Sequence, residues 1–301
     1  MKVAITGANG FLAGYLLDEL LAHGHQVLLL SRGSGARNGQ PFAATDYSAD
    51  SLCGLFGSGG VDAVAHLASS RKVADRFGFY SGLVETTENI YAAAGQCGIS
   101  NVVFTSSISV YSGEALPYSE STPPAPANRY GLYKLACELV GGIFARSGLN
   151  VKNLRLAHIY GANEQNNYMI NRFFRQAHAH ERLFVPCRSV AQREMLYAKD
   201  AARAIRLALE HESFSGVCNV GSGQPLTNAE IARTIASVMS PELEVSLGEE
   251  PETIVSSYMD GSKAAECLGY VPRYTLREAT AEIAADMEKA ASAGSGALPH
   301  V

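Results

Sequence analysis

Two side chains at the start of a predicted helix have the spacing needed for proton transfer. Tyr130 and Lys134 are four residues apart, which places them one turn apart on the same helix face. The pKa of a free tyrosine is near ~10, and a neighbouring ammonium lowers it, so the phenol becomes a usable acid and base near neutral pH. An ordinary surface pair would have the same spacing, so the pair needs support from elsewhere in the chain.

A run of hydroxyl side chains supplies part of that support. Thr105, Ser106, Ser107 and Ser109 follow the apolar residues at 102–104. Open α/β sheets bind ligands at the carboxyl ends of their strands, so this run is expected to face a substrate, with Ser107 holding the reacting oxygen. Serine also ends strands because it suits turns, and each of these hydroxyls alone is weak evidence.

A glycine-rich segment, Thr6–Gly14, joins the first apolar run to the first predicted helix. Gly7 and Gly10 permit a tight turn and the close approach of a pyrophosphate, which would accept hydrogen bonds from the N–H groups at the start of the helix. The third position of the pattern is Ala13, a tolerated substitution where helix and strand pack closely. We therefore expect a bound dinucleotide here.

The second apolar run ends in Ser31 and Arg32 instead of an acidic residue. A carboxylate there would hydrogen-bond the ribose 2′-hydroxyl of NAD, whereas an arginine accommodates the 2′-phosphate of NADP. The sequence thus favours NADP(H) over NAD(H), unless Arg32 is simply an exposed side chain in a flexible, glycine-rich loop.

Apolar runs alternate with helical patterns through the first half of the chain. The predicted strands are Val3–Thr6, Val27–Ser31, Val61–His66, Val102–Ser106 and Val151–Leu156, and the helices between them include Phe11–His23, Val84–Cys97 and Tyr130–Arg146. This alternation predicts an α/β fold with a doubly wound parallel Rossmann sheet and a smaller C-terminal substrate-binding lobe.

The regular alternation of strands and helices ends after Gly161. From there, irregular segments link the helical stretches Met169–His180, Ala201–His211, Thr227–Val238 and Leu276–Glu288. We expect a dinucleotide-binding domain over residues 1–160, to which some later segments return. The substrate-binding lobe is expected mainly over 161–290. The Ala/Ser/Gly run predicts a disordered tail over 291–301.

Composition narrows the class of protein. Of the 301 residues, 47% are hydrophobic, enough for a large core, and the net charge of −5 offers no basic surface to nucleic acid. Gly7 and Gly10 break the apolar N-terminus and no stretch approaches ~20 apolar residues, so neither a signal peptide nor a membrane span is expected. The six scattered cysteines, without a C-x-x-C pair, favour reduced thiols in a cytoplasmic enzyme without a metal site.

Together these segments resemble the extended short-chain dehydrogenase/reductase family, the NAD(P)-dependent epimerase/dehydratase group that includes enzymes similar to UDP-galactose 4-epimerase. The resemblance covers nearly the whole chain, and its motifs occur in the family's order. They are Thr6–Ala13 (glycine fingerprint), Asp46, Asp62–Ala68 (ending in His-Leu-Ala), Thr87–Asn89, Thr105–Tyr111 (with Ser-x-x-Val-Tyr), Tyr130 with Lys134, Leu154–Gly161, Arg193–Asp200, Asn219–Gly223 and Ser262–Lys263. One match could be chance, but an ordered set is not.

The resemblance implies roles for individual residues. Tyr130 is the acid and base, Lys134 tunes it and holds the nicotinamide ribose, and Ser107 orients the reacting oxygen. The residues that would bind NADP or NAD are Gly7, Asn9, Gly10, Phe11, Leu12, Ser31, Arg32, Asp46, Tyr47, Leu67, Ala68, Ser69, Thr105, Tyr130, Lys134, His158 and Ile159. Those that would bind a small-molecule substrate are Ser69, Ser107, Ser109, His158 and Arg193. A homodimer, in which the helices around 84–97 and 130–146 pair across the axis, is also implied.

Departures from the family pattern leave the substrate open. The Asp-Glu pair of the dehydratases is absent after Ser107, which disfavours 4,6-dehydration. His158 stands where nucleotide-sugar enzymes usually carry an asparagine. Arg193 is retained as a candidate diphosphate ligand, but Glu249 and Glu250 stand where a second arginine is expected, and acids would repel a diphosphate.

Three interpretations follow. The first is a nucleotide-sugar 4-epimerase or 4-ketoreductase. The second is an NADPH-dependent reductase or dehydrogenase of a carbonyl compound without a nucleotide, which the missing arginine favours. The third is a non-catalytic dinucleotide-binding redox sensor, which the presence of Tyr130, Lys134 and Ser107 disfavours because a sensor does not need them.

Overall fold

The computed structural model describes residues 1–70, 76–113, 115–164 and 166–292. Its central sheet contains β1 (Lys2–Thr6), β2 (Gln26–Ser31), β3 (Ala36–Arg37), β4 (Gln40–Ala44), β5 (Ala63–His66), β6 (Asn101–Ser107), β7 (Asn150–Leu156) and β11 (Gly216–Val220). The strand order is β11-β7-β6-β5-β1-β2-β4-β3, and the neighbours are parallel from β11 to β4 while β3 returns antiparallel at the edge. The predicted α/β fold with a doubly wound parallel sheet is confirmed.

The five predicted strands form the middle of this sheet because helices bury them on both faces. Val3, Val64 and Val102 have no exposed surface, as expected of continuous apolar runs in a parallel sheet. The strands that the sequence did not predict lie toward the edges. One of them, β4, lies next to the edge strand β3, contains Pro41 and is largely exposed, which hides the strand pattern.

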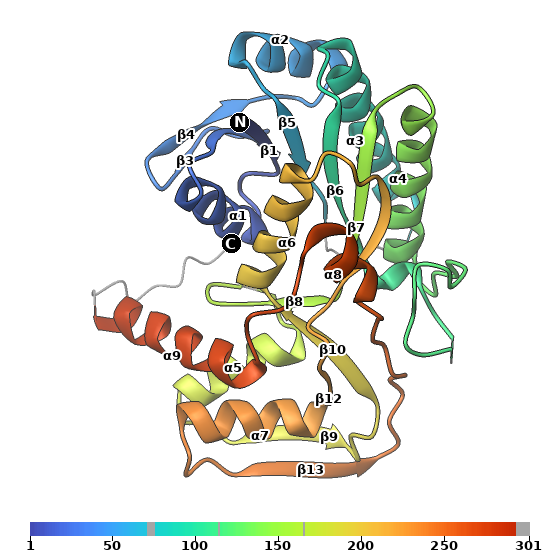
Figure 1. Cartoon of the computed structure of the whole chain (residues 1–301). Helices are drawn as coiled ribbons and strands as arrows, with labels where there is room; N and C mark the ends of the chain where they lie inside the picture. The colour runs from blue at the N-terminus through green and yellow to red at the C-terminus, as the bar shows by residue number, and fades with distance from the viewer. Residues whose placement is uncertain (71–75, 114, 165, 293–301) are drawn as a thin grey trace.

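Helices cover both faces of the sheet (Figure 1). On one face lie α1 (Phe11–Ala22), α6 (Ala198–Glu210) and α8 (Ser262–Leu268), and on the other α2 (Ala49–Gly59), α3 (Gly78–Gln96) and α4 (Arg129–Ala145). Each of α1 and α6 buries an apolar stripe against the strands, including Leu16 and Ile205. Thus α6, α8 and β11 pack with the sheet although they come after residue 160.

The remaining elements form a smaller lobe beyond the carboxyl ends of the strands (Figure 1). They are β8 (His158–Tyr160), α5 (Met169–His178), β9 (Leu183–Cys187), β10 (Gln192–Tyr197), β12 (Pro225–Thr227), α7 (Asn228–Met239), β13 (Val245–Glu250) and α9 (Leu276–Ser292). A separate apolar core that includes Phe173, Leu183 and Ile231 holds the lobe together. The last helix continues to Ser292, into the predicted tail, and residues 293–301 lie outside the described part of the chain.

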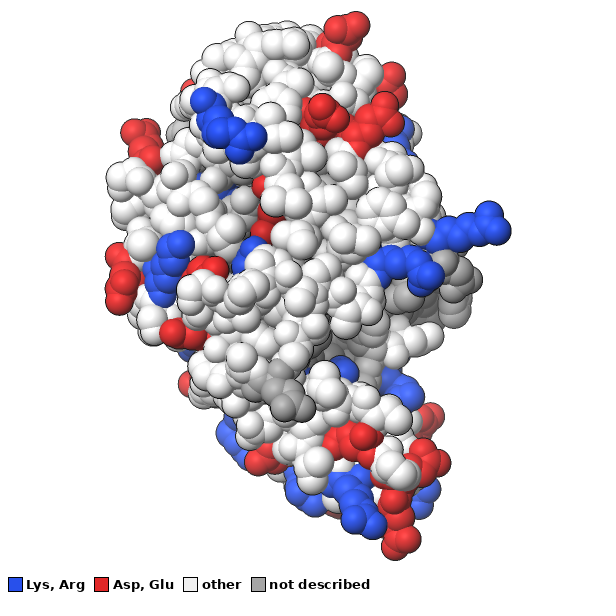
Figure 2. Space-filling model, turned by 90° about the vertical axis from the view of Figure 1, so that its right-hand side faces the viewer, with Lys and Arg blue, Asp and Glu red and all other residues white. Residues whose placement is uncertain are grey.

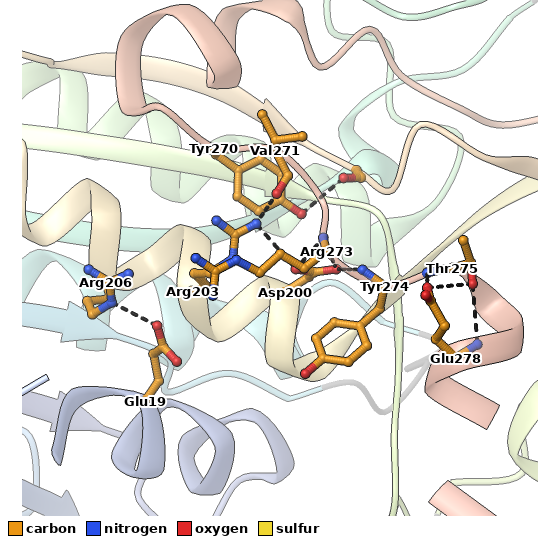
Figure 3. A network of polar contacts seen from close by, with 11 residues as sticks. Glu19, Asp200, Arg203, Arg206, Tyr270, Val271, Arg273, Tyr274, Thr275 and Glu278 are labelled. Atoms are coloured by element: carbon orange, nitrogen blue, oxygen red, sulfur yellow. Dashed lines mark hydrogen bonds and ion pairs between the residues drawn. The ribbon is translucent and has the colours of Figure 1, made fainter. Parts of the chain in front are cut away.

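A polar network fastens α6 to the segment that leads into α9 (Figure 3). The buried carboxylate of Asp200 accepts hydrogen bonds from the backbone N–H groups of Arg273 and Tyr274 at 3.0 and 3.1 Å. Arg206 of α6 donates to Glu19 of α1 at 2.7 Å. The junction between sheet and lobe is therefore built from bonded, largely buried charges, so residues of both can form one site. In the described ranges, no helix has both the length and the apolarity to cross a membrane.

Candidate active site

The sheet itself creates a crevice beside β1. The chain adds strands on the β2 side first and then on the β5 side, so the loops after β1 and β5 diverge at the carboxyl ends of the strands. A cleft of about 1160 Å³ opens there, between the sheet and the lobe. Pockets for one small molecule occupy roughly 300–1,000 Å³, so this cleft has room for a dinucleotide together with a second ligand.

Most of the predicted site residues line this cleft. They are Gly7, Gly10, Phe11, Leu12, Leu67, Ser69, Thr105, Ser107, Ser109, Tyr130, Lys134, His158, Ile159 and Arg193. The structure does not bring the other predicted residues to its wall; these are Asn9, Ser31, Arg32, Asp46, Tyr47 and Ala68. Asn9 and Ser31 are joined by a 2.8 Å hydrogen bond beside the glycine loop, and Arg32 is exposed.

Tyr47 lies beneath the glycine loop. Its hydroxyl accepts a hydrogen bond from the backbone N–H of Gly7 at 2.9 Å and donates to the carbonyl of Leu30 at 3.0 Å. The neighbouring Asp46 is exposed, and its carboxylate accepts from the backbone N–H and hydroxyl of Ser48, which hold its pKa below the usual value. Tyr47 supports the loop, and Asp46 helps to order the start of α2.

The start of α1 is shaped for a pyrophosphate. Its N-cap is Gly10, without a side-chain cap, and its first turn carries no acidic residue. Gly7 has φ +71°, and a Cβ there would lie 2.8 Å from Cα of Ala68, so the two loops touch through their backbones. An uncapped helix N-terminus with a positive dipole end suits a phosphate anion. These residues fit a nicotinamide dinucleotide.

The charge of the cleft also favours anionic ligands. Of the lining residues that the structure describes, Arg129, Lys134 and Arg193 are cationic and none is aspartate or glutamate. The whole chain has a net charge of −5, so this concentration of positive charge is local. A dinucleotide and a second phosphate-bearing ligand would find complementary charges here.

Tyr130 and Lys134 occupy one face of α4, as predicted from their spacing. The Nζ atom of Lys134 lies 5.8 Å from the centroid of the Tyr130 ring and donates to the carbonyl of Thr105 at 2.7 Å. Burial lowers the pKa of Lys134 to about 8, against the opposing effects of Cys137 and Glu138. The lysine is therefore mainly charged at neutral pH, and its remaining N–H groups are available to a ligand.

A glycine lets α4 reach the end of β6. A Cβ on Gly131 would lie 1.9 Å from the carbonyl oxygen of Ser109, so only glycine permits this contact. The approach puts Tyr130 next to the serine-rich turn. There Ser107 Oγ accepts a 3.1 Å hydrogen bond from the backbone N–H of Ser109, which leaves its one proton to donate to a ligand oxygen.

His158 and Arg193 line the part of the cleft formed by the lobe. Nε2 of His158 lies 3.2 Å from Oγ of Ser257, and burial, assisted by the charge of Arg193, lowers the pKa of His158 to about 4. The imidazole is therefore neutral near pH 7. Nε of Arg193 is buried and has no hydrogen-bond partner among the described residues. A half-buried guanidinium with an unused N–H at the wall of a cleft can bind an anion.

Sequence reasoning did not identify all lining residues. Arg129 and the segment 168–170 also face the cleft. Arg129 precedes Tyr130 at the start of α4, where no motif marks it. Tyr168 is the N-cap of α5 and the next two residues begin the helix, so their place in the cleft wall arises only from the docking of the lobe. The described residues contain no cluster of three or more His, Cys, Asp or Glu arranged to hold a metal.

The doubly wound sheet and the cation-lined cleft at its reversal point define a dinucleotide-binding enzyme of the oxidoreductase type. Residues 3–221 match the NAD dependent epimerase/dehydratase family, and the chain belongs to this family. It is 42% identical to a UDP-N-acetylglucosamine 4-epimerase from Bacillus cereus, whose crystal structure superposes with a TM-score of 0.89 over 95% of this chain and 99% of that one. The predicted resemblance to extended short-chain dehydrogenases/reductases is confirmed.

Two further relatives are more distant. A UDP-glucose 4-epimerase of Corynebacterium glutamicum is 25% identical over 91% of this chain and 92% of its own. The structure of MoeE5 in complex with UDP-glucose and NAD is 26% identical, with a TM-score of 0.82 over 97% of this chain and 100% of that one. The chain is thus an NAD-dependent enzyme of the epimerase/dehydratase type, which sets aside the redox-sensor interpretation.

Proposed function

We propose that the enzyme epimerises, or reduces a ketone at, C4 of the sugar in a nucleotide-sugar. The observation that carries this proposal is that Tyr130, Lys134 and Ser107 line the same cleft as the glycine loop. The relatives support the same substrate class, since their names describe 4-epimerases of UDP-sugars or a complex with UDP-glucose.

The side chains divide the chemistry among them. Gly7, Gly10 and the start of α1 would hold a nicotinamide dinucleotide, which would supply reversible hydride transfer at the reacting carbon. Tyr130 accepts the proton of the reacting hydroxyl as the hydride leaves, and gives the proton back when the hydride returns. Lys134 stabilises the negative charge that develops on the Tyr130 oxygen and donates to the ribose. Ser107 donates its free proton to the reacting oxygen and so holds the carbonyl that forms.

Arg193 is the proposed ligand of the diphosphate, with the neutral imidazole of His158 beside it. The second arginine of the family is missing, but the expected repulsion by its replacements has no structural support. Glu249 and Glu250 are exposed at the end of β13, and neither lines the cleft. Among the described lining residues, Arg193 is the cation that the lobe supplies and none is acidic. Burial lowers the pKa of Arg193 against the opposing charge of the nearby Glu252. A nucleotide diphosphate remains compatible with this part of the cleft.

The state of the cofactor after turnover distinguishes the interpretations. A 4-epimerase returns the cofactor unchanged in each cycle, whereas a ketoreductase consumes NAD(P)H in proportion to product. Substrate class is tested by thermal shift with UDP-, GDP-, CDP- and dTDP-sugars in the presence of cofactor, because a ligand at 100 times its Kd stabilises a protein by about 2.7 kcal/mol. The absence of a shift with every nucleotide-sugar would contradict the proposal and favour a carbonyl substrate without a nucleotide.

We also propose that Arg32 gives a preference for NADP(H). It is exposed after β2, whereas Arg37 is committed to the carbonyls of Gly10 and Asn9 at 2.8 and 3.4 Å. A hydrogen bond to a charged group contributes about 1.5–3 kcal/mol, so Arg32→Asp is expected to raise the Kd for NADPH by about tenfold or more and to lower that for NADH. Fluorescence titration measures both, and wild-type protein that binds NADH as tightly as NADPH would refute the preference.

We further propose that the enzyme is a homodimer joined through α3 and α4. Leu132, Leu139 and Ile143 of α4 expose 45%, 65% and 56% of their surface and share one helix face. Figure 2 turns this side of the molecule toward the viewer and shows few charged side chains across the middle of its upper part. Such a patch is typical of an interface.

Leu139→Glu is therefore expected to convert the dimer into a monomer, because it places a charge in the centre of a buried apolar contact. Light scattering after gel filtration measures the mass. Leu21→Glu, at an exposed leucine on α1, is the matched control and is expected to remain dimeric. A monomeric wild type, or dissociation of both variants alike, would contradict the proposed interface.

A further inference from the structure

His66, the last residue of β5, has no role in the chemistry above, although the loop that follows it lines the cleft. Its side chain is fully buried, and its ring lies 5.1 Å from that of Phe104 and 6.5 Å from that of Tyr91, between centroids. Nδ1 is 2.9 Å from Oγ1 of Thr6, and Nε2 is 3.0 Å from Oγ1 of Thr87. An imidazole bonded at both nitrogens has its tautomer set by those partners.

The hydrogen bonds around Thr6 decide which nitrogen carries the proton. Oγ1 of Thr6 accepts from the backbone N–H groups of Leu67 at 3.1 Å and Ala68 at 3.0 Å. These two bonds use both lone pairs of the hydroxyl, and its single proton remains to be donated. Nδ1 of His66 accepts that proton, so the proton of the imidazole must be on Nε2.

The partners on the other side of the ring agree with this assignment. Nε2–H of His66 donates to Oγ1 of Thr87, whose own proton goes to the carbonyl of Leu83 at 2.9 Å. The thiol of Cys137 lies 3.3 Å from the same oxygen and can donate to its second lone pair. Each donor and acceptor of the relay Thr6–His66–Thr87 is then used once, with His66 neutral.

A positive charge on His66 is opposed from several directions. Protonation would aim a second N–H at Thr6, whose lone pairs are occupied. Burial, together with the charge of Lys134 on α4, lowers the pKa of His66 to about 3. The other titratable groups nearby are the thiol of Cys137 on α4 and the phenol of Tyr91 on α3, and burial raises the pKa of both, so neither supplies a negative charge.

We propose that His66 is a positioning residue for the dinucleotide, acting through the hydroxyl of Thr6. As a neutral Nε2–H imidazole it orients that hydroxyl, which holds the backbone of Leu67 and Ala68 against Gly7. Gly7 and Leu67 both line the cleft, and the close approach of Gly7 to Ala68 leaves no room for the two loops to shift independently. The inference rests on the dinucleotide-dependent function proposed above.

Two substitutions separate this role from the filling of space. His66→Asn retains an acceptor oxygen toward Thr6 and loses the arm to Thr87, whereas His66→Leu has a similar volume and loses both. We expect His66→Leu to raise the Kd for the dinucleotide by about tenfold, the equivalent of one net hydrogen bond, and His66→Asn to raise it clearly less. Equal losses of dinucleotide affinity in the two variants would show that His66 only fills space and would contradict the proposal. The control His25→Leu, at a histidine bonded to Glu210 outside the cleft, is expected to bind cofactor normally.

The tautomer can also be read in the unliganded wild-type protein, by long-range ¹H–¹⁵N correlation of the imidazole rings between pH 5 and 8. We expect His66 to remain neutral with its proton on Nε2 throughout. A proton on Nδ1, or a titration of His66 in this range, would overturn the proposal even if the variants failed to fold. This measurement needs no turnover, so its result does not depend on the substrate test. Inactivity toward every nucleotide-sugar would refute the proposed function but not the relay Thr6–His66–Thr87.

Discussion

Tyr130→Phe is expected to lower kcat by about 10²–10⁴-fold, the usual contribution of a positioned acid and base. The substitution removes one oxygen and keeps the ring, whose centroid lies 6.1 Å from that of Tyr133 and 5.8 Å from Nζ of Lys134. Folding and cofactor binding should therefore persist. Turnover of the best nucleotide-sugar, thermal melting and NAD(P)H fluorescence measure the three properties separately.

Tyr133 provides the matched control for this experiment. It lies on the same helix, is fully buried, stacks on Tyr80 and donates to Ser69 at 3.3 Å, yet it does not line the cleft. We expect Tyr133→Phe to retain turnover within about tenfold, since it loses only weak neutral hydrogen bonds, with Ser69 and with the thiol of Cys137. Near-normal activity of Tyr130→Phe, or an equal loss in both variants, would remove Tyr130 from the proposed role.

The sequence predicts the middle of the fold well and its margins poorly. Strands such as β5 and β6 are buried on both faces, so their apolar runs are continuous and bounded by turns. The start of α3 is less apparent, because Gly78 and Gly82 interrupt the helical pattern, and the helix begins at Gly78 instead of at Val84. The edge strand β11 lies far along the chain, beyond the simple alternation of strands and helices.

The same division applies to the site. Tyr130 and Lys134 could be predicted as a pair because a helix fixes the relation of residues four apart. The bond between Thr6 and His66 spans 60 residues and depends on the register of β1 with β5, in which Thr6 is paired with His66. The periodic pattern of apolar residues does not determine which residues of two strands are paired. The relay and the buried ion pair behind the active site are consequently features that only the folded chain reveals.

That ion pair joins α4 to β7, one turn beyond Lys134. Arg155 donates to Glu138 from both Nε, at 3.0 Å, and Nη2, at 2.6 Å, and each side chain is only 4% exposed. Nη1 of Arg155 also donates to the hydroxyl of Tyr111 at 2.6 Å, and Ser106 donates to Glu138 at 2.5 Å. The network thus connects the helix of Tyr130 with the turn that carries Ser107.

Removing one member of this pair is expected to be strongly destabilising, because the other charge is left buried without its partner. Glu138→Leu and Arg155→Met should each lower the free energy of unfolding by about 3–5 kcal/mol, measured by urea denaturation. The double variant Glu138→Leu/Arg155→Met leaves no unpaired charge. Its loss of unfolding free energy should therefore be smaller than the sum of the two single-variant losses by roughly 1–3 kcal/mol.

If the losses in the free energy of unfolding simply add in the double variant, the interaction between the two charges contributes nothing beyond the packing of each side chain. A double variant that is stable and still inactive would carry a different meaning. It would show that apolar packing can replace the pair in holding α4 to β7, but not in holding the turn after β6. At that turn the hydroxyl of Ser106 would lose its only acceptor among the described bonds. The hydroxyl of Tyr111 would keep only its bond to Asn219, at 3.0 Å. In that case the pair serves mainly to align Ser107 with Tyr130. The cost of burying its two charges then follows from packing a polar turn against the helix of Tyr130.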